Sequence, residues 1–316
     1  MGKIAFVFPG QGSQQVGMEK DLLTQSLKAR SMFEAADKRL NFKITDLIMN
    51  GPEEELTLTE NTQPAILTVS AILHALLLEK GVRPDFVAGH SLGEYSALYA
   101  AGVMSFEDAV YAVRQRGLLM EAAVPAGQGT MAAVLGLEAR MLQKLCKKVS
   151  DEGEPVQLAN LNSPSQIVIS GSVKGVEEAS ALAEEAGARR VIPLPVSGPF
   201  HSSLMKPAAE AMRKVLDNLQ MKTAAVPVIA NSTAEEEEAV DVIRQHLIEQ
   251  IYSPVRWIQS IERLKDLGVD TYLEVGPGKV LSGLIKKIHR GAAIFQVHDL
   301  ESLETTASKL KERVGE

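Results

Sequence analysis

A glycine-framed pentapeptide carries the residues of this chain that are best suited to nucleophilic chemistry. Gly89-His-Ser-Leu-Gly93 has the pattern G-x-S-x-G and stands between an apolar segment, 86–88, and a helix-like segment, 94–100. A nucleophile elbow needs this context, because the serine must lie on a sharp strand-to-helix turn in which glycines let two backbones approach closely. The turn would also direct helix N-terminal amides at the serine, so the N–H of Leu92 is a candidate oxyanion donor. We predict that Ser91 is a nucleophile; the alternative is a glycine-rich turn with an incidental serine.

A serine nucleophile needs a base, and the chain has six histidines. His201 is the best placed, because it follows Ser-Gly-Pro-Phe at a predicted strand-to-helix crossing, where a side chain can project into a cleft. His90 adjoins the serine and is the next candidate. The others lie in an apolar helical pattern or in charged stretches: His74, His246, His289 and His298. We predict His201 as the base, with a structural histidine at a helix start as the alternative.

Two other glycine loops do not match nucleotide-binding motifs. The loop 10–12 follows a strand-like segment, but a dinucleotide fingerprint would need glycine where Gln15 stands. The loop 276–279 lacks the first glycine and the Ser/Thr of a phosphate loop, since Leu273 and Val280 hold those places. The sequence has no H-E-x-x-H motif and no paired Cys/His spacing, so no metal site is expected.

Composition excludes several classes of protein. The chain has 316 residues, 45% hydrophobic and 23% charged, which is ordinary for globular proteins and suggests about two domains. Lys and Arg number 33 and Asp and Glu number 40, a net charge of −7 without a dense basic run, so nucleic acid is not an expected partner. The longest apolar stretch, 65–78, contains polar residues and is too short to span a bilayer, so no membrane association is expected.

The single cysteine, Cys146, cannot form an intrachain disulfide. A chain that cannot form an internal disulfide is typical of proteins in the reducing cytoplasm, so we predict a cytoplasmic protein. Apolar residues recur around it at helical spacing, namely Met141, Leu142, Leu145 and Val149. We therefore interpret Cys146 as a packing residue.

Strand-like segments alternate with longer helical patterns, which predicts an α/β fold with parallel strands. Strands are expected at 4–8, 85–88, 227–230 and 271–275. Helices are expected at 17–27, 31–40, 63–80, 92–100, 203–219, 240–250, 255–267 and 279–289. The acidic run Glu235 to Glu238 is expected in a solvated loop or helix start.

The middle of the chain has a different pattern. Strands are expected at 131–135, 156–161, 166–170 and 190–194, with helices at 138–149 and 173–186. This βαββαβ order is that of a ferredoxin-like unit, and clusters of Pro and Gly at 125–129 and 193–199 flank it. We predict an inserted small domain of residues 128–196, and one discontinuous large domain of residues 1–127 and 197–316.

Together these residues make the chain resemble the bacterial malonyl-CoA:acyl carrier protein transacylases, the FabD-type acyltransferases of fatty acid biosynthesis. The motifs that carry the resemblance run in order along nearly the whole chain: Phe8-Pro-Gly-Gln-Gly-Ser-Gln14, Gly89-His-Ser-Leu-Gly-Glu94, Arg114-Gln-Arg-Gly117, Asn160-Leu-Asn-Ser-Pro164, Gly198-Pro-Phe-His-Ser202, Tyr252-Ser-Pro-Val-Arg-Trp257 and Glu274-Val-Gly-Pro-Gly278. The resemblance implies an α/β-hydrolase-like large domain with an inserted ferredoxin-like small domain, in agreement with the boundaries above.

The resemblance also implies the roles of single residues. Ser91 is then the nucleophile and His201 its base. The main-chain amides of Gln11 and Leu92 form the oxyanion hole. The Gln250 main-chain carbonyl orients His201 in place of a triad acid, which is chemically reasonable because a carbonyl that accepts the Nδ1–H sets the tautomer.

Two further residues would select the substrate. The resemblance implies that Arg116 holds the malonyl carboxylate and that Phe200 crowds the α-carbon of the acyl group. Without the resemblance, Arg116 is equally a surface helix residue and Phe200 an ordinary packing residue. The implied reaction is ping-pong: malonyl-CoA acylates the serine, and the phosphopantetheine thiol of acyl carrier protein takes the malonyl group. Coenzyme A then enters as a thioester substrate, and no cofactor is implied.

Three alternatives remain open at this point. The same elbow serves a serine hydrolase or thioesterase, an acyltransferase of a polyketide pathway, or a domain that binds a carrier protein without catalysis. A basic cluster lies on the predicted helix 279–289, and an acidic carrier protein would favour docking there. Its members are Lys279, Lys286, Lys287 and Arg290, and the alternative is a solvated helix face.

Overall fold

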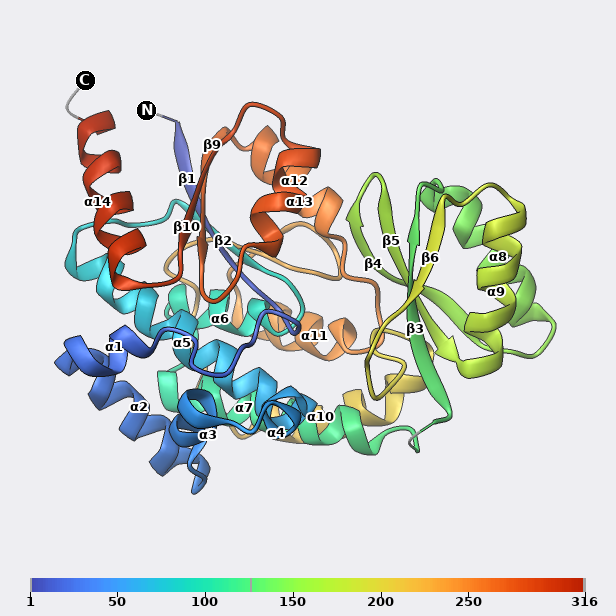
Figure 1. The fold of residues 1–316 in the computed structure, drawn as a ribbon, viewed down its shortest axis with the longest axis horizontal. Coiled ribbons are helices and arrows are strands. Elements are labelled where there is room, and N and C mark those ends of the chain that lie inside the picture. The colour runs from blue at the N-terminus through green and yellow to red at the C-terminus, as the bar shows by residue number, and fades with distance from the viewer. Residues whose placement is uncertain (1, 126, 315–316) are drawn as a thin grey trace.

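The computed structural model describes residues 2–125 and 127–314 and has a mixed α/β fold built on two sheets. Figure 1 shows the larger sheet surrounded by helices on the left and the smaller sheet with two helices on the right. The N-terminal strand and the C-terminal helix lie on the side of the large part that is remote from the small sheet (Figure 1).

The larger sheet has six strands in the order β10-β9-β1-β2-β7-β8. Neighbouring strands are parallel, except that β8 is antiparallel to β7. The strands are Lys3–Phe8 (β1), Phe86–Gly89 (β2), Val228–Ile229 (β7), Glu236–Glu237 (β8), Val269–Val275 (β9) and Ala293–Val297 (β10). The last four residues of β1 are fully buried, as expected of a parallel strand that helices cover on both faces.

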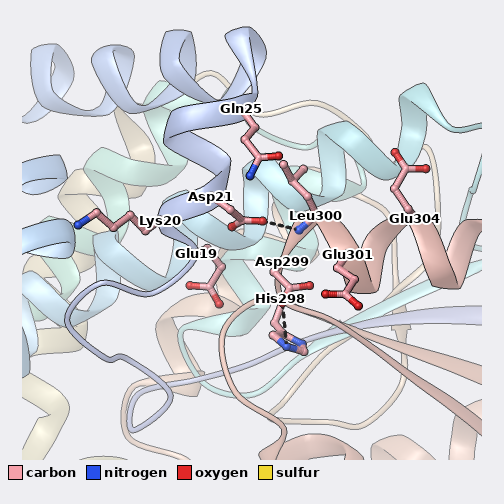
Figure 2. Close-up of a pocket in the computed structure, with 9 residues that line it drawn as sticks. All are labelled: Glu19, Lys20, Asp21, Gln25, His298, Asp299, Leu300, Glu301 and Glu304. Carbon is pink, nitrogen blue, oxygen red and sulfur yellow. Dashed lines mark hydrogen bonds and ion pairs between the residues drawn. The ribbon is translucent and has the colours of Figure 1, made fainter.

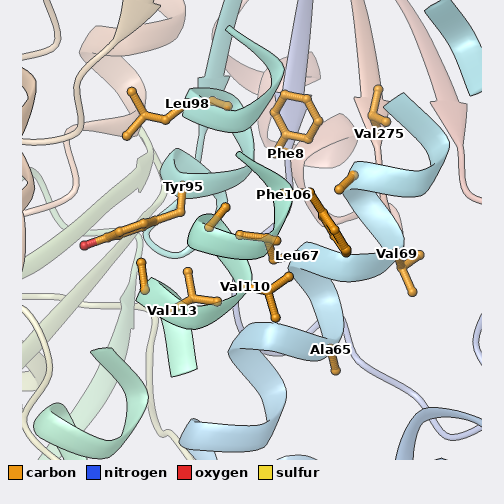
Figure 3. Packing of buried hydrophobic residues seen from close by; sticks show 14 of the residues in the cluster. Phe8, Ala65, Leu67, Val69, Tyr95, Leu98, Phe106, Val110, Val113 and Val275 are labelled. Atoms are coloured by element: carbon orange, nitrogen blue, oxygen red, sulfur yellow. The ribbon is translucent and has the colours of Figure 1, made fainter. Parts of the chain in front are cut away.

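Helices cover this sheet. They are Lys20–Gln25 (α1), Leu27–Leu40 (α2), Ile44–Asn50 (α3), Glu53–Thr57 (α4), Thr59–Glu79 (α5), Gly93–Ala100 (α6), Phe106–Ala122 (α7), Lys206–Asp217 (α10), Val240–Gln250 (α11), Trp257–Asp266 (α12), Val280–Ile288 (α13) and Leu300–Val314 (α14), with a 3₁₀ turn at Ser203–Met205 (η1). Figure 3 shows side chains of α5, α6 and α7 packed together near Phe8 of β1 and Val275 of β9. Burial of apolar side chains in this layer fixes α5 and α6 against the sheet and α7 against these two helices.

Helix α5 differs from the expectation for the apolar stretch 65–78. It has 21 residues and is by length and composition apolar enough to cross a membrane, so the expectation that it is too short was wrong. However, 83% of its most apolar window is buried inside the fold. A helix that is apolar all round and buried is a core helix, and α5 is the central one here.

The smaller sheet has four strands in the order β4-β5-β3-β6, and all neighbours are antiparallel. Its strands are Gly129–Leu135 (β3), Val156–Ser163 (β4), Gln166–Ser172 (β5) and Arg190–Pro193 (β6), with helices Ala139–Asp151 (α8) and Val173–Glu185 (α9). The two helices stack on one side of this sheet (Figure 1) around a separate apolar cluster. The two chain crossings lie side by side, because a Cβ at Gly129 would overlap the ring of Pro199.

Cys146 lies in that apolar cluster on α8 and is 2% exposed. Leu142 and Val149 are buried beside it, whereas Met141, expected in the same stripe, is 45% exposed because it lies about 100° around the helix from Leu142, at the edge of the buried face. Burial raises the pKa of the Cys146 thiol to about 12.

We expect Cys146 to be a chemically silent bystander. A thiolate fraction lowered by burial should make alkylation in the native protein on the order of 10³-fold slower than in the unfolded chain at pH 8. The measurement is intact mass after timed iodoacetamide treatment, with and without denaturant. Strong loss of transfer activity in a stable Cys146→Ser variant would contradict a bystander role.

Helix and strand boundaries differ from the expected ones in a few places. The expected helix 17–27 is shorter, because Ser26 is extended and caps α2 by accepting a hydrogen bond from the Ala29 amide. Helices α3, α4, α7 and α14 and strand β10 were not predicted. The acidic run was placed wrongly: Glu236 and Glu237 form edge strand β8, and Glu237 is 3% exposed. Its Oε2 lies 2.6 Å from His246 Nδ1, a partner that makes burial of the carboxylate tolerable.

Candidate active site

The carboxyl ends of neighbouring strands bring the candidate residues together. Strands β1, β2 and β7 are adjacent and parallel, with Phe8 opposite Gly89. Gln11, Ser91 and Asn231 lie directly beyond the ends of these three strands. Ligands of open α/β sheets bind at this edge, so the topology alone concentrates polar groups where a site is expected.

The turn after β2 has the geometry that a nucleophile elbow requires. Ser91 has a φ of 54°, in the left-handed region that non-glycine residues rarely adopt. A Cβ at Gly89 would overlap the backbone of Gly93, and a Cβ at Gly93 would overlap the carbonyl of Phe8, so both glycines are sterically required. Asn231 holds the turn: its Oδ1 accepts from the Ser91 amide at 2.8 Å, and its Nδ2 donates to the Gly89 carbonyl at 2.6 Å.

Ser91 and His201 form a hydrogen-bonded pair although they lie far apart in the sequence. Ser91 Oγ is 2.8 Å from His201 Nε2, and His201 Nδ1 is 2.8 Å from the main-chain carbonyl oxygen of Gln250. A carbonyl only accepts, so Nδ1 carries the hydrogen and Nε2 is free to accept the serine proton. Gln250 is the last residue of α11, where helix carbonyls have no partner within the helix.

The environment keeps His201 neutral. Burial and, next, the Arg116 cation lower the pKa of His201 to about 3, from 6.5 for an ordinary histidine. An imidazole with a lowered pKa is uncharged above that pH, so His201 is a proton acceptor throughout the physiological range. The α11 C-terminus carries partial negative charge and would favour the imidazolium that forms when the proton moves.

Arg116 lies on α7 and is 1% exposed. Its Nη1 donates to Gln63 Oε1 at 2.8 Å, and its Nη2 donates to Gln250 Oε1 at 2.8 Å and to Ser91 Oγ at 3.0 Å. Among the residues described here, no carboxylate forms an ion pair with it. An unpaired buried cation is costly, so an anionic ligand beside Ser91 would be strongly favoured. The alternative of a surface helix residue is therefore wrong.

Sequence reasoning missed a polar layer beneath the serine. Glu94 is fully buried; it accepts from Gln250 Nε2 at 2.6 Å and from the Asn231 amide at 3.3 Å. Gln250 Nε2 also donates to the Ser91 carbonyl at 2.9 Å. Burial, with the nearby charge of Glu237, raises the pKa of Glu94. For Asn231 the one available signal was its position after the strand 227–230.

A cavity of about 130 Å³ opens beside the serine–histidine pair. It has room for about four water molecules at roughly 30 Å³ each, which matches a short acyl group. Its lining comprises Gln11, His90, Ser91, Leu92, Arg116, Met120, Met131, Asn160, Leu194, Val196, Phe200 and His201. The structure thus brings every predicted site residue to this cavity except Gln250, which lies behind it.

The main-chain amides of Gln11 and Leu92, the predicted oxyanion donors, have no hydrogen-bond partner within residues 2–125 and 127–314, and both residues line the cavity. Leu92 immediately precedes α6, so the partial positive charge of that helix terminus reinforces its N–H. Phe200, also in the lining, is 5% exposed and joins the main apolar core, so it both packs and faces the cavity.

The other histidines have different surroundings. His90 Nε2 lies 2.7 Å from Asn162 Oδ1, and its ring packs edge-on against Trp257. His74 lies edge-on to aromatic rings in the core. His246 pairs with Glu237, His289 with Tyr272, and His298 with Asp299. Of the described histidines, His201 is the one whose ring nitrogen is bonded to Ser91 Oγ.

A larger hollow of about 650 Å³ lies elsewhere, where α1 approaches the start of α14. Figure 2 shows its lining, in which carboxylates gather around Glu19 and Asp299. Burial, with nearby Asp21 and Asp299, raises the pKa of Glu19 to about 8. Asp21 Oδ2 accepts from the Leu300 amide at 2.9 Å, which ties α1 to α14 (Figure 2). No group of His, Cys, Asp and Glu in the described parts of the chain is arranged to hold a metal ion.

A third hollow, of about 300 Å³, connects the cavity with α13. It shares Gln11, His90, Asn160 and Leu194 with the cavity and continues to side chains of α13, namely Val280, Leu281 and Leu284. The basic residues predicted on this helix are all exposed: Lys279, Lys286, Lys287 and Arg290. Val280, at the start of the helix, is 55% exposed. Helix α13 and its flanking residues therefore carry exposed basic side chains, and the exposed Val280 lines the hollow that adjoins the cavity.

The geometry is that of a hydrogen-bonded serine–histidine pair beside a small cavity, and comparison with known proteins assigns the family. The family model described as "Acyl transferase domain" matches residues 5–305, so the chain belongs to the acyl transferase family. Its relatives within that family are malonyl CoA-acyl carrier protein transacylases. The chain is 56% identical to that of Bacillus subtilis strain 168 over 312 residues, covering 99% of this chain and 98% of the relative.

Solved structures agree with this placement. The malonyl CoA-acyl carrier protein transacylase of Coxiella burnetii superposes with a TM-score of 0.95 at 38% identity, covering 98% of each chain. A malonyl-transacylase in complex with a type II polyketide synthase acyl-carrier protein superposes with a TM-score of 0.94 at 42% identity, covering 97% of this chain and 99% of that one.

Proposed function

We propose that this protein moves a malonyl group from coenzyme A to the phosphopantetheine thiol of acyl carrier protein, in fatty acid biosynthesis. The observation that carries the proposal is Arg116, a buried guanidinium that contacts the nucleophile and has no carboxylate partner in the described parts of the chain. A planar, permanently charged fork is suited to a free carboxylate, and malonyl-CoA presents one next to its thioester. The relatives named above support the same donor and acceptor.

In the first half-reaction, Ser91 Oγ attacks the thioester carbonyl and its proton passes to His201 Nε2. The developing oxyanion accepts hydrogen bonds from the Gln11 and Leu92 amides. The tetrahedral intermediate then collapses: the C–S bond breaks, the sulfur of coenzyme A takes the proton from His201, and malonyl remains as an ester on Ser91.

In the second half-reaction, the thiol of the carrier's phosphopantetheine arm attacks the ester carbonyl. His201 takes the thiol proton and returns it to Ser91 Oγ as the C–O bond breaks, which regenerates the free enzyme. Both steps need one group that alternates between base and acid. The Gln250 carbonyl holds the imidazole in the required tautomer in both steps. The scheme uses thioester substrates and no further cofactor.

Intact mass spectrometry tests the proposal directly. Mixing with malonyl-CoA should add one malonyl group to the protein, and holo acyl carrier protein should then remove it and become malonylated. The absence of an adduct, with free malonate released, would instead indicate a serine hydrolase or thioesterase. Offering carriers of fatty acid and polyketide synthesis in competition decides between the two pathways, because the chemistry is the same in both.

Loss of the base should slow the first half-reaction severely. We expect His201→Ala to reduce the rate of Ser91 acylation about 10²–10⁴-fold, the usual effect of removing a general base. The measurement is single-turnover acylation by malonyl-CoA, read as intact mass. His90→Ala serves as the matched control, because its imidazole also borders the cavity but is bonded to Asn162. If His201→Ala acylates within tenfold of the parent while His90→Ala is slow, the two assignments are reversed.

We also propose that acyl carrier protein docks on α13, beside Lys279, Lys286, Lys287 and Arg290. The support is the hollow that adjoins the cavity beside Ser91 and extends to this helix, together with the exposed Val280 at the start of the helix. Carrier docking of this kind places positive charge around an apolar contact and lets the phosphopantetheine arm follow the hollow to the ester.

Charge reversal tests the docking surface. We expect Lys286→Glu with Lys287→Glu to raise the KM for carrier protein about tenfold at low salt, with the difference shrinking as salt is added. Transfer from the acyl-enzyme to free pantetheine, which needs no docking, should be unchanged. The control is Lys309→Glu with Lys311→Glu on α14, where both lysines are also exposed. Equal effects of the two double variants would move the docking site away from α13.

We also propose that the two parts of the fold are distinct domains. The antiparallel order β4-β5-β3-β6 with two helices supports a ferredoxin-like small domain of residues 128–196. The parallel sheet with its elbow after β2 supports an α/β-hydrolase-like large domain of residues 1–127 and 197–316. We further propose that Phe200 limits substitution at the acyl α-carbon, since it borders the cavity, and that the protein is cytoplasmic.

A further inference from the structure

We propose that Arg116 acts as a carboxylate-operated switch on the nucleophile. In the free enzyme it holds Ser91 Oγ in a hydrogen bond that lowers its reactivity, and a carboxylate-bearing acyl group draws the guanidinium away as it binds. Only such acyl groups would then meet a fully reactive serine. The inference rests on the proposed function in one respect, that Ser91 is the group acylated.

The hydrogen bonds of Arg116 show why the carboxylate and the serine compete. Nη2 carries two hydrogens, and both are used: one for Gln250 Oε1 at 2.8 Å and one for Ser91 Oγ at 3.0 Å. Gln63 and Gln250, which hold the other contacts of the guanidinium, do not line the cavity, whereas Ser91 does. The Nε–H of Arg116 is buried without a partner in the described parts of the chain. A carboxylate that binds the Nε side of the guanidinium in a bidentate manner also needs an Nη2 hydrogen. Of the two acceptors that hold the Nη2 hydrogens, only Ser91 lines the cavity, so the carboxylate competes with Ser91 for that hydrogen.

The bond to Arg116 places the serine in an unfavourable state for attack. Ser91 Oγ gives its hydrogen to His201 Nε2, so the oxygen has only its lone pairs for the thioester carbonyl. A charge-assisted hydrogen bond from a guanidinium occupies one of them and withdraws electron density from the oxygen. Removing that bond while keeping the one to His201 leaves a serine that is both oriented and free to attack.

The electrostatics of the base agree in direction. Arg116 is the second cause, after burial, of the lowered pKa of His201. A carboxylate bound to Arg116 would offset its charge, so the imidazole would become a stronger proton acceptor at the moment when substrate is present. The same contact would release the nucleophile and strengthen its base.

A different reading of the same contact predicts the opposite result. If the Arg116 N–H stabilised a serine alkoxide, it would help every acyl donor, and any ligand that drew it away would slow the reaction. A separate carboxylate should therefore accelerate acylation by a neutral acyl donor if Arg116 is a switch, and should slow it if Arg116 stabilises the alkoxide.

Formate with acetyl-CoA is the decisive pair. Acetyl and formate together contain the same heavy atoms as a malonyl group, but only formate can reach for Arg116. We expect formate to accelerate acetylation of Ser91 in single-turnover mass measurements saturably, by about tenfold, the effect of losing one charge-assisted hydrogen bond. Chloride keeps the ionic strength constant. The same formate should slow malonylation by malonyl-CoA, because both compete for Arg116.

Two variants bracket the result. Arg116→Ala should acetylate about tenfold faster than the parent without formate and should not respond to it. Arg114→Ala, which removes the same charge two residues away, should keep the formate response, because its guanidinium bonds to the Glu60 carbonyl and Asn61, and not to Ser91.

The switch would be overturned if formate slowed acetylation of the parent. It would also be overturned if formate inhibited malonylation but left acetylation unchanged. A formate effect on neither donor, together with an Arg116→Ala variant that acetylates no faster than the parent, would overturn it as well. Failure of the proposed function has a separate signature, the absence of any malonyl adduct on Ser91.

Discussion

Replacing Ser91 with alanine is expected to abolish the malonyl adduct and leave the fold intact. The reaction has no other route, because the ester forms on the hydroxyl that the variant lacks, and loss of a serine nucleophile lowers turnover on the order of 10⁶-fold in a comparable enzyme. Alanine has the same Cβ as serine, so the strained φ of 54° changes little in cost. Intact mass after incubation with malonyl-CoA is the measurement.

A matched control separates chemistry from stability. Ser91→Cys keeps a nucleophile at the same place beside His201 and should still form an adduct, now as a thioester. Thermal unfolding of Ser91→Ala should remain cooperative, although the Arg116 N–H that bonded to Oγ loses its partner, which costs about 1–3 kcal/mol if water does not replace it. A malonyl adduct at another residue of Ser91→Ala would show that the nucleophile is assigned wrongly.

The second large effect concerns substrate choice. We expect Arg116→Ala to lower kcat/KM for malonyl-CoA by about 10²–10⁴, since two charge-assisted bonds of roughly 1.5–3 kcal/mol each are lost. Acetyl-CoA has no carboxylate, so its kcat/KM should improve, as expected when the Arg116 bond to Ser91 Oγ is removed. Lysine at position 116 should restore malonyl transfer only in part, because an ammonium lacks the planar fork.

The ratio of the two kcat/KM values is the informative quantity. Arg116 also donates hydrogen bonds to Gln63 and Gln250, so its loss leaves two buried acceptors unpaired and destabilises the folded enzyme. That destabilisation lowers the two kcat/KM values by the same factor. A structural role of that kind cancels in the malonyl-to-acetyl ratio, whereas carboxylate recognition does not. Equal loss for the two donors would mean that Arg116 supports the fold and does not bind the substrate.

Much of the fold was predictable from the sequence because its signals are local. The alternation of strand-like and helix-like segments predicted the parallel sheet, and helix α11 was placed at its observed bounds, Val240–Gln250. The βαββαβ order of the small sheet was visible in the same way. The elbow is partly local, since Gly89 is needed because of its contact with Gly93, whereas Gly93 is needed because the turn packs against the carbonyl of Phe8 on strand β1.

Helices α3 and α4 were not predicted, because they are short and lie between stronger patterns. Strand β8 was misassigned for a different reason. Glu237 is tolerated in a buried position because α11 brings His246 Nδ1 to within 2.6 Å of its carboxylate. This contact cannot be predicted from the run of acidic residues alone. The length of α5 was likewise underestimated at its N-terminal end, where polar residues enter the helix and become buried.

What the sequence by itself determined is therefore the strand-to-helix turn at Ser91, the order of elements and the set of candidate side chains. What only the tertiary structure decided is which of these side chains meet. Ser91 and His201 are 110 positions apart, and α7 carries Arg116 into the same cavity from a third place in the chain. The physical reason is that hydrogen bonding, burial and charge act over a few ångströms in space, so the unpaired state of Arg116 and the neutral state of His201 exist only after the sheet has brought the three elements together.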